Sequence, residues 1–565
     1  MPSRKRLFVI VGAVTAVIVI GLAVWLAVNV LSTARQGQQL QDDVNAAKAS
    51  ISRLDIPAAS ADLQAVIASS TALDASTDGL AWRLAEQMPF IGDSARAASA
   101  FASAARVLSV AAQPLISSVG GQDTTTGKLM AVISNPEAVT FLRTAAQQAS
   151  DELGDISPDG LNFGLDAAVT DAQASLPGLV SALDEVARST GPMTSMLGAD
   201  KPTTWLVMAQ NPAELRGSGG LFSAYLLVTL NDGQMEIVEA GSRKGLDGEF
   251  PMAEQIPYWE AVSPETAGTW GPALGEWASF NIPPDFPTVA KLAAAGMKKR
   301  GTPVDGVIAI DPTVTAAILA GTGSVEHKGM VIDSSTAEEF FTKGLYQDFP
   351  GFDDVKAKDE LAMGLTYATI DAALKRPLDA PSLWNAMSAA VEGGHLKAWS
   401  SNEADQAWLE TTPVAAAFSQ HPNDVVVGFL NGTGGKLDPY ITRDVAIDYS
   451  RCESDKTVDL TIAMANEAPK GLPAYVDVTL DQDGVPDSSV PKGFSRTFVT
   501  AYAPGTTLED ASFLKAATKD GEKIAPSYGG TSGRPNWTVP VELNRGDSTQ
   551  IAMTFVVTAC PTQAI

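Results

Sequence analysis

Residues 211–245, NPAELRGSGGLFSAYLLVTLNDGQMEIVEAGSRKG, decide how the central part of this chain folds. A glycine-rich turn that holds Arg216 opens onto an apolar run with strand character, and an Asn-Asp-Gly turn leads to a second such run. The second run ends at Arg243 and Lys244. Two adjacent strands would therefore bring Arg216 and the Arg243–Lys244 pair towards one end of a sheet. Basic side chains beside flexible glycine amides suit an anionic ligand such as a phosphate.

The composition is that of a globular protein with several domains. The chain has 565 residues, of which 45% are hydrophobic and 18% are charged. The formal net charge is -26, and a surface that acidic repels nucleic acid. We therefore expect no nucleic-acid partner, and any phosphate site must be a local basic pocket.

Cysteine and histidine are too sparse for the familiar metal sites. Cys452 and Cys560 are the only cysteines, so a Cys-x-x-Cys zinc site is excluded. The three histidines, at positions 327, 395 and 421, are not spaced like a zinc pair, and no Gly-x-Ser-x-Gly elbow accompanies them.

An uncharged apolar run near the N-terminus predicts a membrane anchor. Residues 7–31 carry no charged side chain, and about 20 apolar residues span a bilayer core. A cleavable signal sequence usually has an apolar region of only ~7–15 residues. Arg4, Lys5 and Arg6 precede the run, so the positive-inside rule keeps the N-terminus in the cytoplasm and the bulk of the chain outside. This predicts a single-pass protein of the cell membrane.

An exported setting also favours a disulfide between Cys452 and Cys560, because exported proteins tolerate and use such bonds. Two buried free thiols are the alternative.

Composition and periodicity predict a multidomain fold. A cytoplasmic tip and transmembrane helix would be followed by an α-helical bundle, an α/β core and a C-terminal β-sandwich. The helical region is either a stalk that lifts the core off the membrane or a domain packed onto its neighbour. The predicted boundaries are 1–32, 33–200, 201–437 and 438–565.

The string QNPAELRGSGGLFSAYLLVTLNDGQMEI resembles the signature of a bacterial family known only as domain of unknown function 4012. Further similar strings begin at Asp285, Gly393 and Asn431, so that the resemblance covers most of residues 201–450. The family occurs in cell envelopes, often beside genes for surface-polysaccharide assembly, and no established activity comes with the name.

The order of elements also resembles that of the LytR-CpsA-Psr enzymes, which transfer glycopolymers from a polyprenyl pyrophosphate carrier to the cell wall. Those enzymes have an Arg-containing glycine turn, a strand pair and a basic residue at the end of the second strand. Arg216 and Arg243 are in these places here, and the passages around Asp311 and Gly321 follow in the same order. The resemblance implies an LytR-CpsA-Psr-like core and a phosphotransferase.

Two departures bear on catalysis. Ser223 stands where that family has a metal-binding Asp, and Asp247 comes three positions after the Arg243–Lys244 pair instead of next to Arg243. Magnesium-assisted phosphoryl chemistry would need such a carboxylate, so Mg²⁺ as a cofactor and the enzyme activity stay open.

The candidate site residues follow from this resemblance and the basic turn. The expected catalytic residues are Arg216, Arg243 and Asp247, and the expected phosphate-binding residues are Arg216, Gly219, Gly220, Arg243 and Lys244. The charged candidates have structural alternatives: Arg216 could be satisfied by loop carbonyls or Glu214, Arg243–Lys244 could be a solvated strand end, and Asp247 could be an ordinary surface carboxylate of an acidic protein. Asp311, a further residue of this region, is more typical of a helix N-cap than of a catalytic group.

Two other stretches leave their roles open. The aromatic residues Tyr258, Trp259, Trp270, Trp277 and Phe280 could line a groove for sugar rings or a prenyl chain, or form the core of an ordered loop. Gly432-Thr-Gly-Gly-Lys436 lacks the spacing of a nucleotide-binding loop and is expected to be a turn.

The functional expectation is a membrane-anchored protein of cell-envelope polysaccharide assembly. It would bind or transfer a polyprenyl-pyrophosphate-linked glycan and contact polysaccharide-assembly proteins. The alternatives are a non-catalytic envelope scaffold or adaptor and a carbohydrate-binding module.

Overall fold

The computed structural model describes residues 42–43, 46, 56–77, 92–120, 131–161, 165–243, 245–246, 256–376, 378–480, 485–504 and 513–560. The described residues divide into two compact units, one built from those up to 201 together with 232–234, and the other from 202–231 and from 235 onward.

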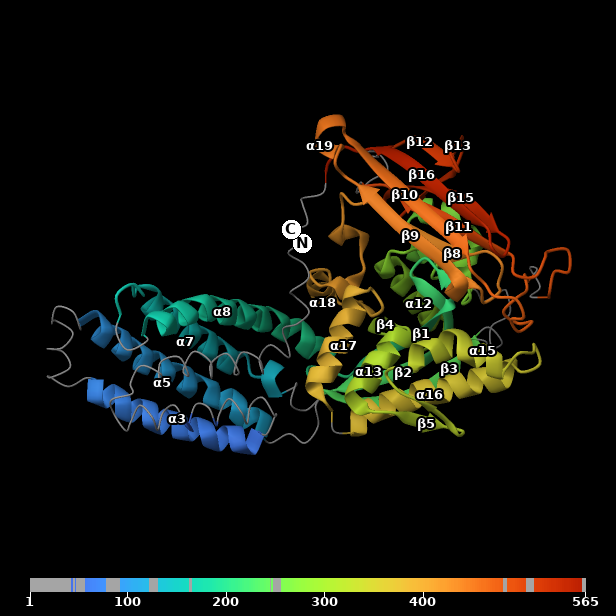
Figure 1. The fold of residues 1–565 in the computed structure, drawn as a ribbon. Helices are drawn as coiled ribbons and strands as arrows, with labels where there is room; N and C mark the ends of the chain where they lie inside the picture. Colours follow the sequence, from blue (N-terminus) through green and yellow to red (C-terminus); the bar gives the residue numbers. More distant parts are fainter. Residues whose placement is uncertain are drawn as a thin grey trace. The chain divides into compact units, whose positions relative to one another are not determined.

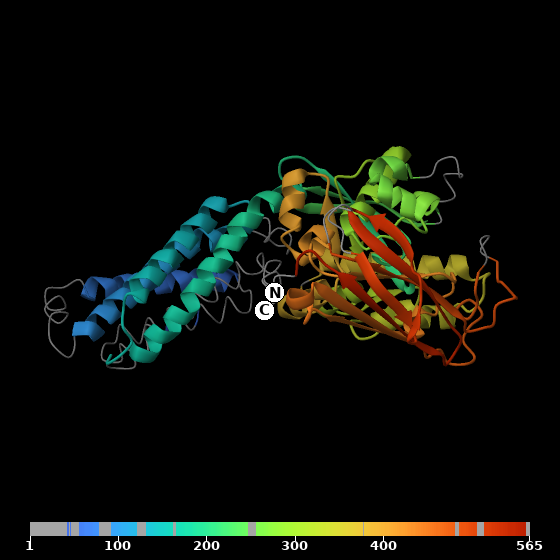
Figure 2. The same ribbon diagram turned by 90° about the horizontal axis from the view of Figure 1, so that it is seen from above.

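The first unit is helical. Its long described helices are α3 (Ile56–Thr77), α5 (Gly92–Gly120), α7 (Pro136–Gly154) and α8 (Leu165–Met196), which lie side by side (Figures 1 and 2). Leu108, Leu142 and Leu183 are fully buried among many alanines, and small side chains let the helices approach closely. Asn135 caps α7 by accepting a hydrogen bond from the amide of Ala138, with Pro136 in the first turn. A helical region was expected here, and its role as a stalk stays a prediction.

Helix α5 bears on the membrane prediction. Within the part of the chain that the structure describes, it alone is long and apolar enough to cross a membrane. Half of its most apolar stretch is buried inside the protein, as in a core helix of a bundle, so α5 is only weak evidence for membrane anchoring. The predicted anchor, residues 7–31, lies outside the described residues.

A five-stranded mixed sheet forms the centre of the second unit. Its strands are β1 (Thr203–Arg216), β2 (Gly219–Asn231), β3 (Gln234–Ser242), β4 (Gly306–Ile310) and β7 (Lys397–Ser400), in the order β3-β2-β1-β4-β7. β1 runs antiparallel to β2 and parallel to β4, and β4 runs antiparallel to β7. The mixed α/β character of this region was expected from the alternation of strand-like and helix-like runs.

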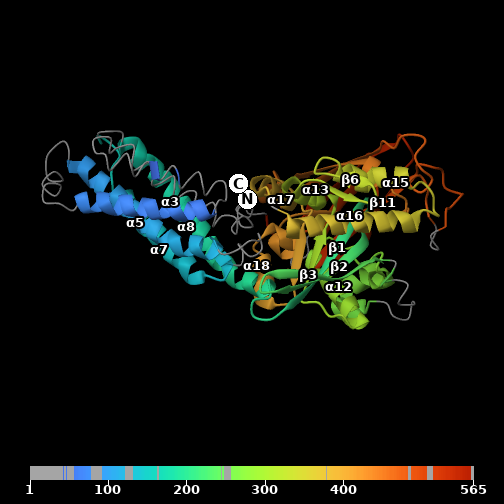
Figure 3. The same ribbon diagram turned by 90° about the horizontal axis from the view of Figure 1, so that it is seen from below.

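Helices cover both faces of this sheet (Figure 3). α12 (Phe286–Arg300) packs on one face, where Phe222, Phe280 and Phe286 are fully buried. α13 (Pro312–Thr322), α16 (Val355–Lys375) and α17 (Ala380–Glu392) belong to the other side. α12 and α13 begin where Asp and Pro signals predict, because the carboxylates of Asp285 and Asp311 accept hydrogen bonds from first-turn amides.

Short elements connect these parts. They are α10 (Tyr258–Ala261), α11 (Pro264–Trp270), η3 (Gly271–Gly275), β5 (Val325–His327), β6 (Met330–Ile332), α14 (Ala337–Glu339), the π-helical turn η4 (Phe340–Gly344), α15 (Leu345–Asp348), α18 (Glu403–Leu409), η5 (Pro413–Ala415), η6 (Phe418–Gln420), η7 (Asp438–Tyr440) and α19 (Cys452–Asp455).

The glycine-rich turn between β1 and β2 is a tight hairpin. A Cβ on Gly217 would lie 1.9 Å from the carbonyl oxygen of Ile282, and one on Gly220 would lie 2.2 Å from the backbone carbon of Asn211. The register of the hairpin shifts between Asn211 and Leu215, which places Pro212 in a bulge. Close backbone packing therefore accounts for these glycines.

Two antiparallel sheets form the C-terminal part. One has the order β13-β12-β16-β10-β9 and the other β14-β15-β11-β8, and their strands stack in two layers (Figures 1 and 2). The strands are β8 (Val426–Asn431), β9 (Ile441–Asp448), β10 (Thr457–Asn466), β11 (Ser495–Tyr502), β12 (Phe513–Lys519), β13 (Glu522–Lys523), β14 (Ser527–Thr531), β15 (Arg534–Leu543) and β16 (Ser548–Val556). Val458, Val499 and Phe555, fully buried, belong to the one apolar core that both sheets share. β8 precedes the predicted start of the sandwich at residue 438.

Cys452 and Cys560 form a disulfide with a Cα–Cα distance of 5.8 Å, which confirms the predicted pairing. The bond joins the segment before β10 to the segment after β16, so it closes a loop that contains most of the sandwich.

One expected strand is absent from the described structure. The alternating run AYVDVTL at 474–480 reads as a strand, but residues 474–478 form turns and irregular backbone. Val476 is buried against Ala213, Tyr346 and Leu437, so this segment packs on the α/β core as a loop. This loop carries Tyr475 to the cavity described next.

Candidate functional site

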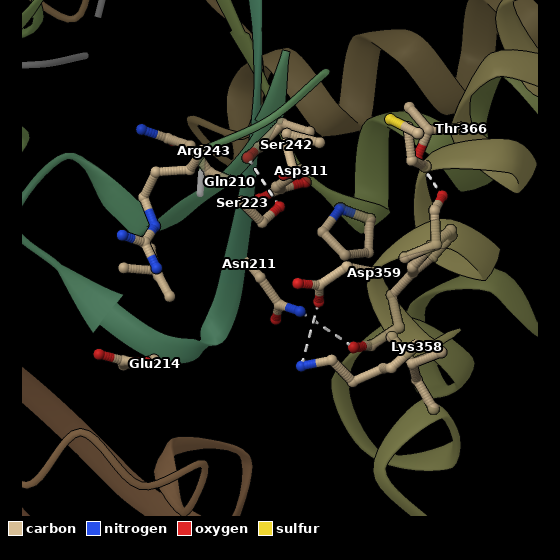
Figure 4. A pocket seen from close by; sticks show the side chains of 18 of the residues that line it. Gln210, Asn211, Glu214, Ser223, Ser242, Arg243, Asp311, Lys358, Asp359 and Thr366 are labelled. Atoms are coloured by element: carbon tan, nitrogen blue, oxygen red, sulfur yellow. Dashed lines mark hydrogen bonds and ion pairs between the residues drawn. The ribbon is translucent and has the colours of Figure 1, made fainter. Parts of the chain in front are cut away.

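A cavity of about 100 Å³ lies beside the ends of β1 and β4, bounded by strand, helix and sandwich residues. The strands of the central sheet contribute Gln210, Ser223 and Ser242 to its lining. Helix α16 contributes Lys358, Asp359 and Thr366. Lys436 and Tyr475 come from the segments around the sandwich. Figure 4 shows Arg243, Ser223 and Asp311 on one side and Lys358 and Asp359 on the other.

A buried charge cluster forms one wall of this cavity. The Glu214 carboxylate accepts a hydrogen bond from Arg216 Nη2 at 2.9 Å and forms an ion pair with Lys436 Nζ. All three side chains are less than a tenth exposed. Burial alone would raise the pKa of Glu214, but the attraction of Lys436 and Arg216 outweighs burial and holds that pKa at about 2. Two cations therefore share one carboxylate, and the cluster has a formal charge of +1.

The turn at 431–436 places Lys436 in this cluster. Asn431 Oδ1 accepts hydrogen bonds from the amides of Thr433 and Gly434 at 2.8 and 2.9 Å. Gly434 has φ +67°, which favours glycine. The sequence did predict a turn here and did not assign Lys436 a functional role.

A second buried cation, Lys358, lies between two tyrosine rings. Its Nζ is 4.5 Å from the ring centre of Tyr475 and 5.3 Å from that of Tyr346, and 3.5 Å from the Tyr475 hydroxyl. Its nearest carboxylate is Asp359 at 3.3 Å. Burial raises the pKa of Tyr346 well above its usual value, so that ring stays neutral.

Arg243 and Arg216 reach different places. Arg216 is the last residue of β1, and Arg243 directly follows β3. β1 and β2 are antiparallel, and a two-residue turn joins β2 to β3. Both arginines are therefore at the same end of the sheet, as predicted. Arg243 lines the cavity and is half-buried. The guanidinium of Arg216 instead donates to the carbonyls of Ala278 and Leu215 as well as to Glu214.

Three described residues that the sequence placed at the ligand, Arg216, Gly219 and Gly220, do not line this cavity. The structural alternative for Arg216, with loop carbonyls and Glu214 as partners, describes its contacts. Lys244 and Asp247 lie outside the described residues, so their predicted roles stay predictions.

Asp247, the carboxylate on which the magnesium hypothesis depends, lies outside the described residues, so Mg²⁺ as a cofactor stays a prediction. Ser223 lines the cavity, and its hydroxyl donates to the carbonyl of Ala209 at 3.0 Å. Within the described ranges, no group of three or more His, Cys, Asp or Glu side chains gathers as metal ligands would. We therefore derive no step through a metal.

Most of the candidate aromatic residues belong to the core and not to the cavity. Trp277 and Phe280 are buried against Phe222, while Tyr258 and Trp270 are partly buried against the same cluster. Trp259 is the exception at 60% exposure. The ordered-loop alternative therefore describes four of the five.

The comparisons with known proteins support one of the two resemblances. A search of curated proteins and a search of solved structures gave no match. The LytR-CpsA-Psr resemblance receives no support from them. Residues 200–346 match the model of the family described as "Protein of unknown function (DUF4012)", which confirms the first resemblance for that segment.

Proposed function

We propose that this protein binds a phosphate- or pyrophosphate-bearing ligand in the cavity, and that it serves in cell-envelope polysaccharide assembly with a polyprenyl-pyrophosphate-linked glycan as that ligand. The observation that carries the proposal is the buried Arg216–Glu214–Lys436 cluster. Its carboxylate is shared by two cations, so the cluster keeps a formal charge of +1 beside a cavity.

The arrangement favours an anion for an electrostatic reason. Removing charges from water is costly, and a buried cation without a full counter-charge gains most from an anion that enters beside it. Lys358 and Arg243 add two cations to the lining, and Asp359 and Asp311 add two carboxylates, so the formal charge of the site stays that of the cluster, +1, in a chain whose formal net charge is -26. A locally positive site in an otherwise acidic protein also attracts an anionic ligand to that site in preference to the remaining surface.

The proposal gives the two arginines different roles. Arg243 meets the ligand directly, with the planar fork of donors that matches a phosphate. Arg216 acts through Glu214, because it shares the negative charge that would otherwise neutralise Lys436.

Binding without cleavage is the second candidate, an envelope scaffold that holds the glycan. Ser223 favours it, because a hydroxyl bonded to the carbonyl of Ala209 stands where the LytR-CpsA-Psr pattern has a metal-binding carboxylate. Release of inorganic phosphate from the bound ligand separates a transferase or phosphatase from a scaffold.

The test is calorimetric titration of the full-length protein with geranylgeranyl pyrophosphate and with inorganic pyrophosphate. Lys436→Met and Lys358→Met should each weaken binding by roughly tenfold or more, since hydrogen bonds to charged groups contribute about 1.5–3 kcal/mol. Lys328→Met is the matched control, because Lys328 is exposed, pairs with Glu360 and does not line the cavity.

The two probes distinguish the sources of the phosphate. Tighter binding of the lipid form supports a lipid-linked ligand, and equal binding supports recognition of the pyrophosphate alone. Absence of binding by a folded wild-type protein, or equal loss in the Lys328 control, would overturn the proposal.

A further inference from the structure

A carboxylate faces the same cavity from the end of β4. Asp311 lines the cavity, and its Oδ1 accepts hydrogen bonds from the amides of Thr313 and Val314 at 2.9 and 3.4 Å as the N-cap of α13. Its Oδ2 lies 2.6 Å from Nδ1 of His395. A carboxylate has about four acceptor positions, so these three contacts leave about one for a further donor.

This carboxylate is unfavourable for a bare phosphate, because two anions in one small cavity repel each other. A hydroxyl group of the ligand would remove the conflict, since it donates to the carboxylate and carries no charge. The neighbouring lining is also suited to a hydroxylated ligand, with the hydroxyls of Ser223, Ser242 and Thr315 and the amide of Gln210.

We propose that Asp311 accepts a hydrogen bond from a sugar hydroxyl of the ligand, so that the cavity takes a glycosyl phosphate or pyrophosphate with its sugar directed towards Asp311 and its phosphate towards Lys436, Lys358 and Arg243. This inference rests on the proposed function, and it adds the orientation of the ligand in the cavity and the residue that selects its sugar. His395 is the positioning residue that fixes the orientation of the Asp311 carboxylate.

His395 is placed to act in this way. Its ring is 38% exposed, so its outer edge reaches solvent while Nδ1 meets the buried carboxylate. Its hydrogen bond with Asp311 raises the pKa of His395; burial and the charge of Lys397 oppose that effect, and Glu338 supports it. Lys397 is buried behind this pair and donates to the carbonyl of Gly394, and burial lowers its pKa to about 8.

The size of the cavity is compatible with this assignment. A volume of about 100 Å³ is several times the ~10–15 Å³ that one enclosed water molecule needs. It holds a phosphate group with its nearest substituents, while the rest of a larger glycan or lipid stays outside.

The experiment compares two phosphate esters that differ in hydroxyl groups, α-D-glucose 1-phosphate and n-butyl phosphate, on the full-length protein. We expect the wild type to prefer the sugar phosphate by about tenfold or more, as sites built to pair a hydroxyl discriminate strongly. Asp311→Asn should remove that preference while it leaves the affinity for butyl phosphate unchanged or higher. Asn caps a helix as well as Asp, so α13 keeps its N-cap.

The matched control is Asp379→Asn, since Asp379 is the N-cap of α17, accepts a hydrogen bond from the amide of Ser382 and does not line the cavity. It should bind both esters like the wild type. For His395, the Asn variant places an amide donor near the position of Nδ1 and should keep the preference, whereas His395→Ala should lower it.

The outcomes separate this inference from the function on which it rests. Equal binding of both esters by the wild type, or an unchanged preference in Asp311→Asn, would overturn the Asp311 subsite and leave phosphate binding intact. Binding of neither ester by the folded wild type would overturn both.

Discussion

The cavity region and the C-terminal sandwich are both built on β-sheets, yet they bury different chemistry. Beside the cavity, Glu214, Arg216 and Lys436 are charged and less than a tenth exposed. The core that the two sandwich sheets share is apolar, with Leu460 and Ile551 fully buried, and a disulfide closes the structure. Arg534, at the start of β15, is also buried, and its guanidinium donates to the backbone carbonyls of Phe418 and Asp424. The cavity wall buries a carboxylate that two cations share, whereas the core common to the two sandwich sheets consists of apolar side chains.

The difference indicates what each region contributes. Apolar burial stabilises a fold by about 25 cal/mol per Å² removed from water. Buried ion clusters contribute less, because desolvation offsets much of their attraction, and an apolar replacement is often neutral or stabilising. We infer that the sandwich supplies stability, whereas the charged wall is better explained by a ligand.

The largest expected effect tests the sandwich. Replacing Cys452 and Cys560 by alanine opens a loop that spans 108 positions, which should cost about 4–5 kcal/mol on the chain-entropy model. Hydrogen-exchange mass spectrometry of β10 and β16 peptides measures this change locally. Reducing the wild type with dithiothreitol should reproduce it. Unchanged exchange in the double variant would mean that the sandwich core alone maintains the domain.

The second prediction contrasts the two arginines. Arg216→Met removes a charged hydrogen bond to buried Glu214 and donors to two carbonyls; Lys436 still pairs with Glu214, so we expect a cost of about 1.5–3 kcal/mol. Arg243→Met, at a half-buried position, should lower the free energy of unfolding by less than Arg216→Met does, while it weakens phosphate binding. Thermal melting and titration of both variants check this. Equal melting temperatures of the Arg216→Met and Arg243→Met variants would contradict the assignment of a structural role to Arg216 and a ligand-binding role to Arg243.

The smallest effect concerns the charges around Asp311. Since contact with Asp311 raises the folded pKa of His395 above 6.5, the stabilisation from this contact is fully present below pH 6.5. It is lost as pH rises through the folded pKa. Imidazole chemical shifts in an NMR titration should show the raised pKa, and Asp311→Asn should lower it. A His395 pKa at or below 6.5 in the wild type would contradict the coupling.

Features with local signals could be predicted from the sequence. Asp285 and Asp311 each precede a proline-containing first turn, and both helices begin there because capping is a property of neighbouring residues. The strand pair around Asn231–Gly233 follows from turn chemistry. The disulfide follows from the presence of two cysteines alone and the expected export.

The cavity depended on signals that are not local. Lys358, Lys436 and Tyr475 come from three distant segments, and nothing in their immediate sequence marks a site. The direction of Arg216 was equally hidden, since a basic residue in a glycine turn reads the same whether it points to a ligand or to Glu214. The alternation around Tyr475 predicted a strand, but burial in this segment does not alternate: the neighbours Val476 and Asp477 are both buried in a loop on the α/β core.

The dispersed origin of the cavity wall has a consequence for folding kinetics. Its residues extend from position 209 to position 475, so the chain must close several long loops before the wall exists. Contacts of such high sequence separation form slowly, after local helices and hairpins. Lys436 and Tyr475 also lie beyond residues 200–346, so the matched segment alone cannot assemble the complete wall. In a refolding experiment, recovery of phosphate binding would therefore mark the final step, when the α/β core and the segments around the sandwich have docked.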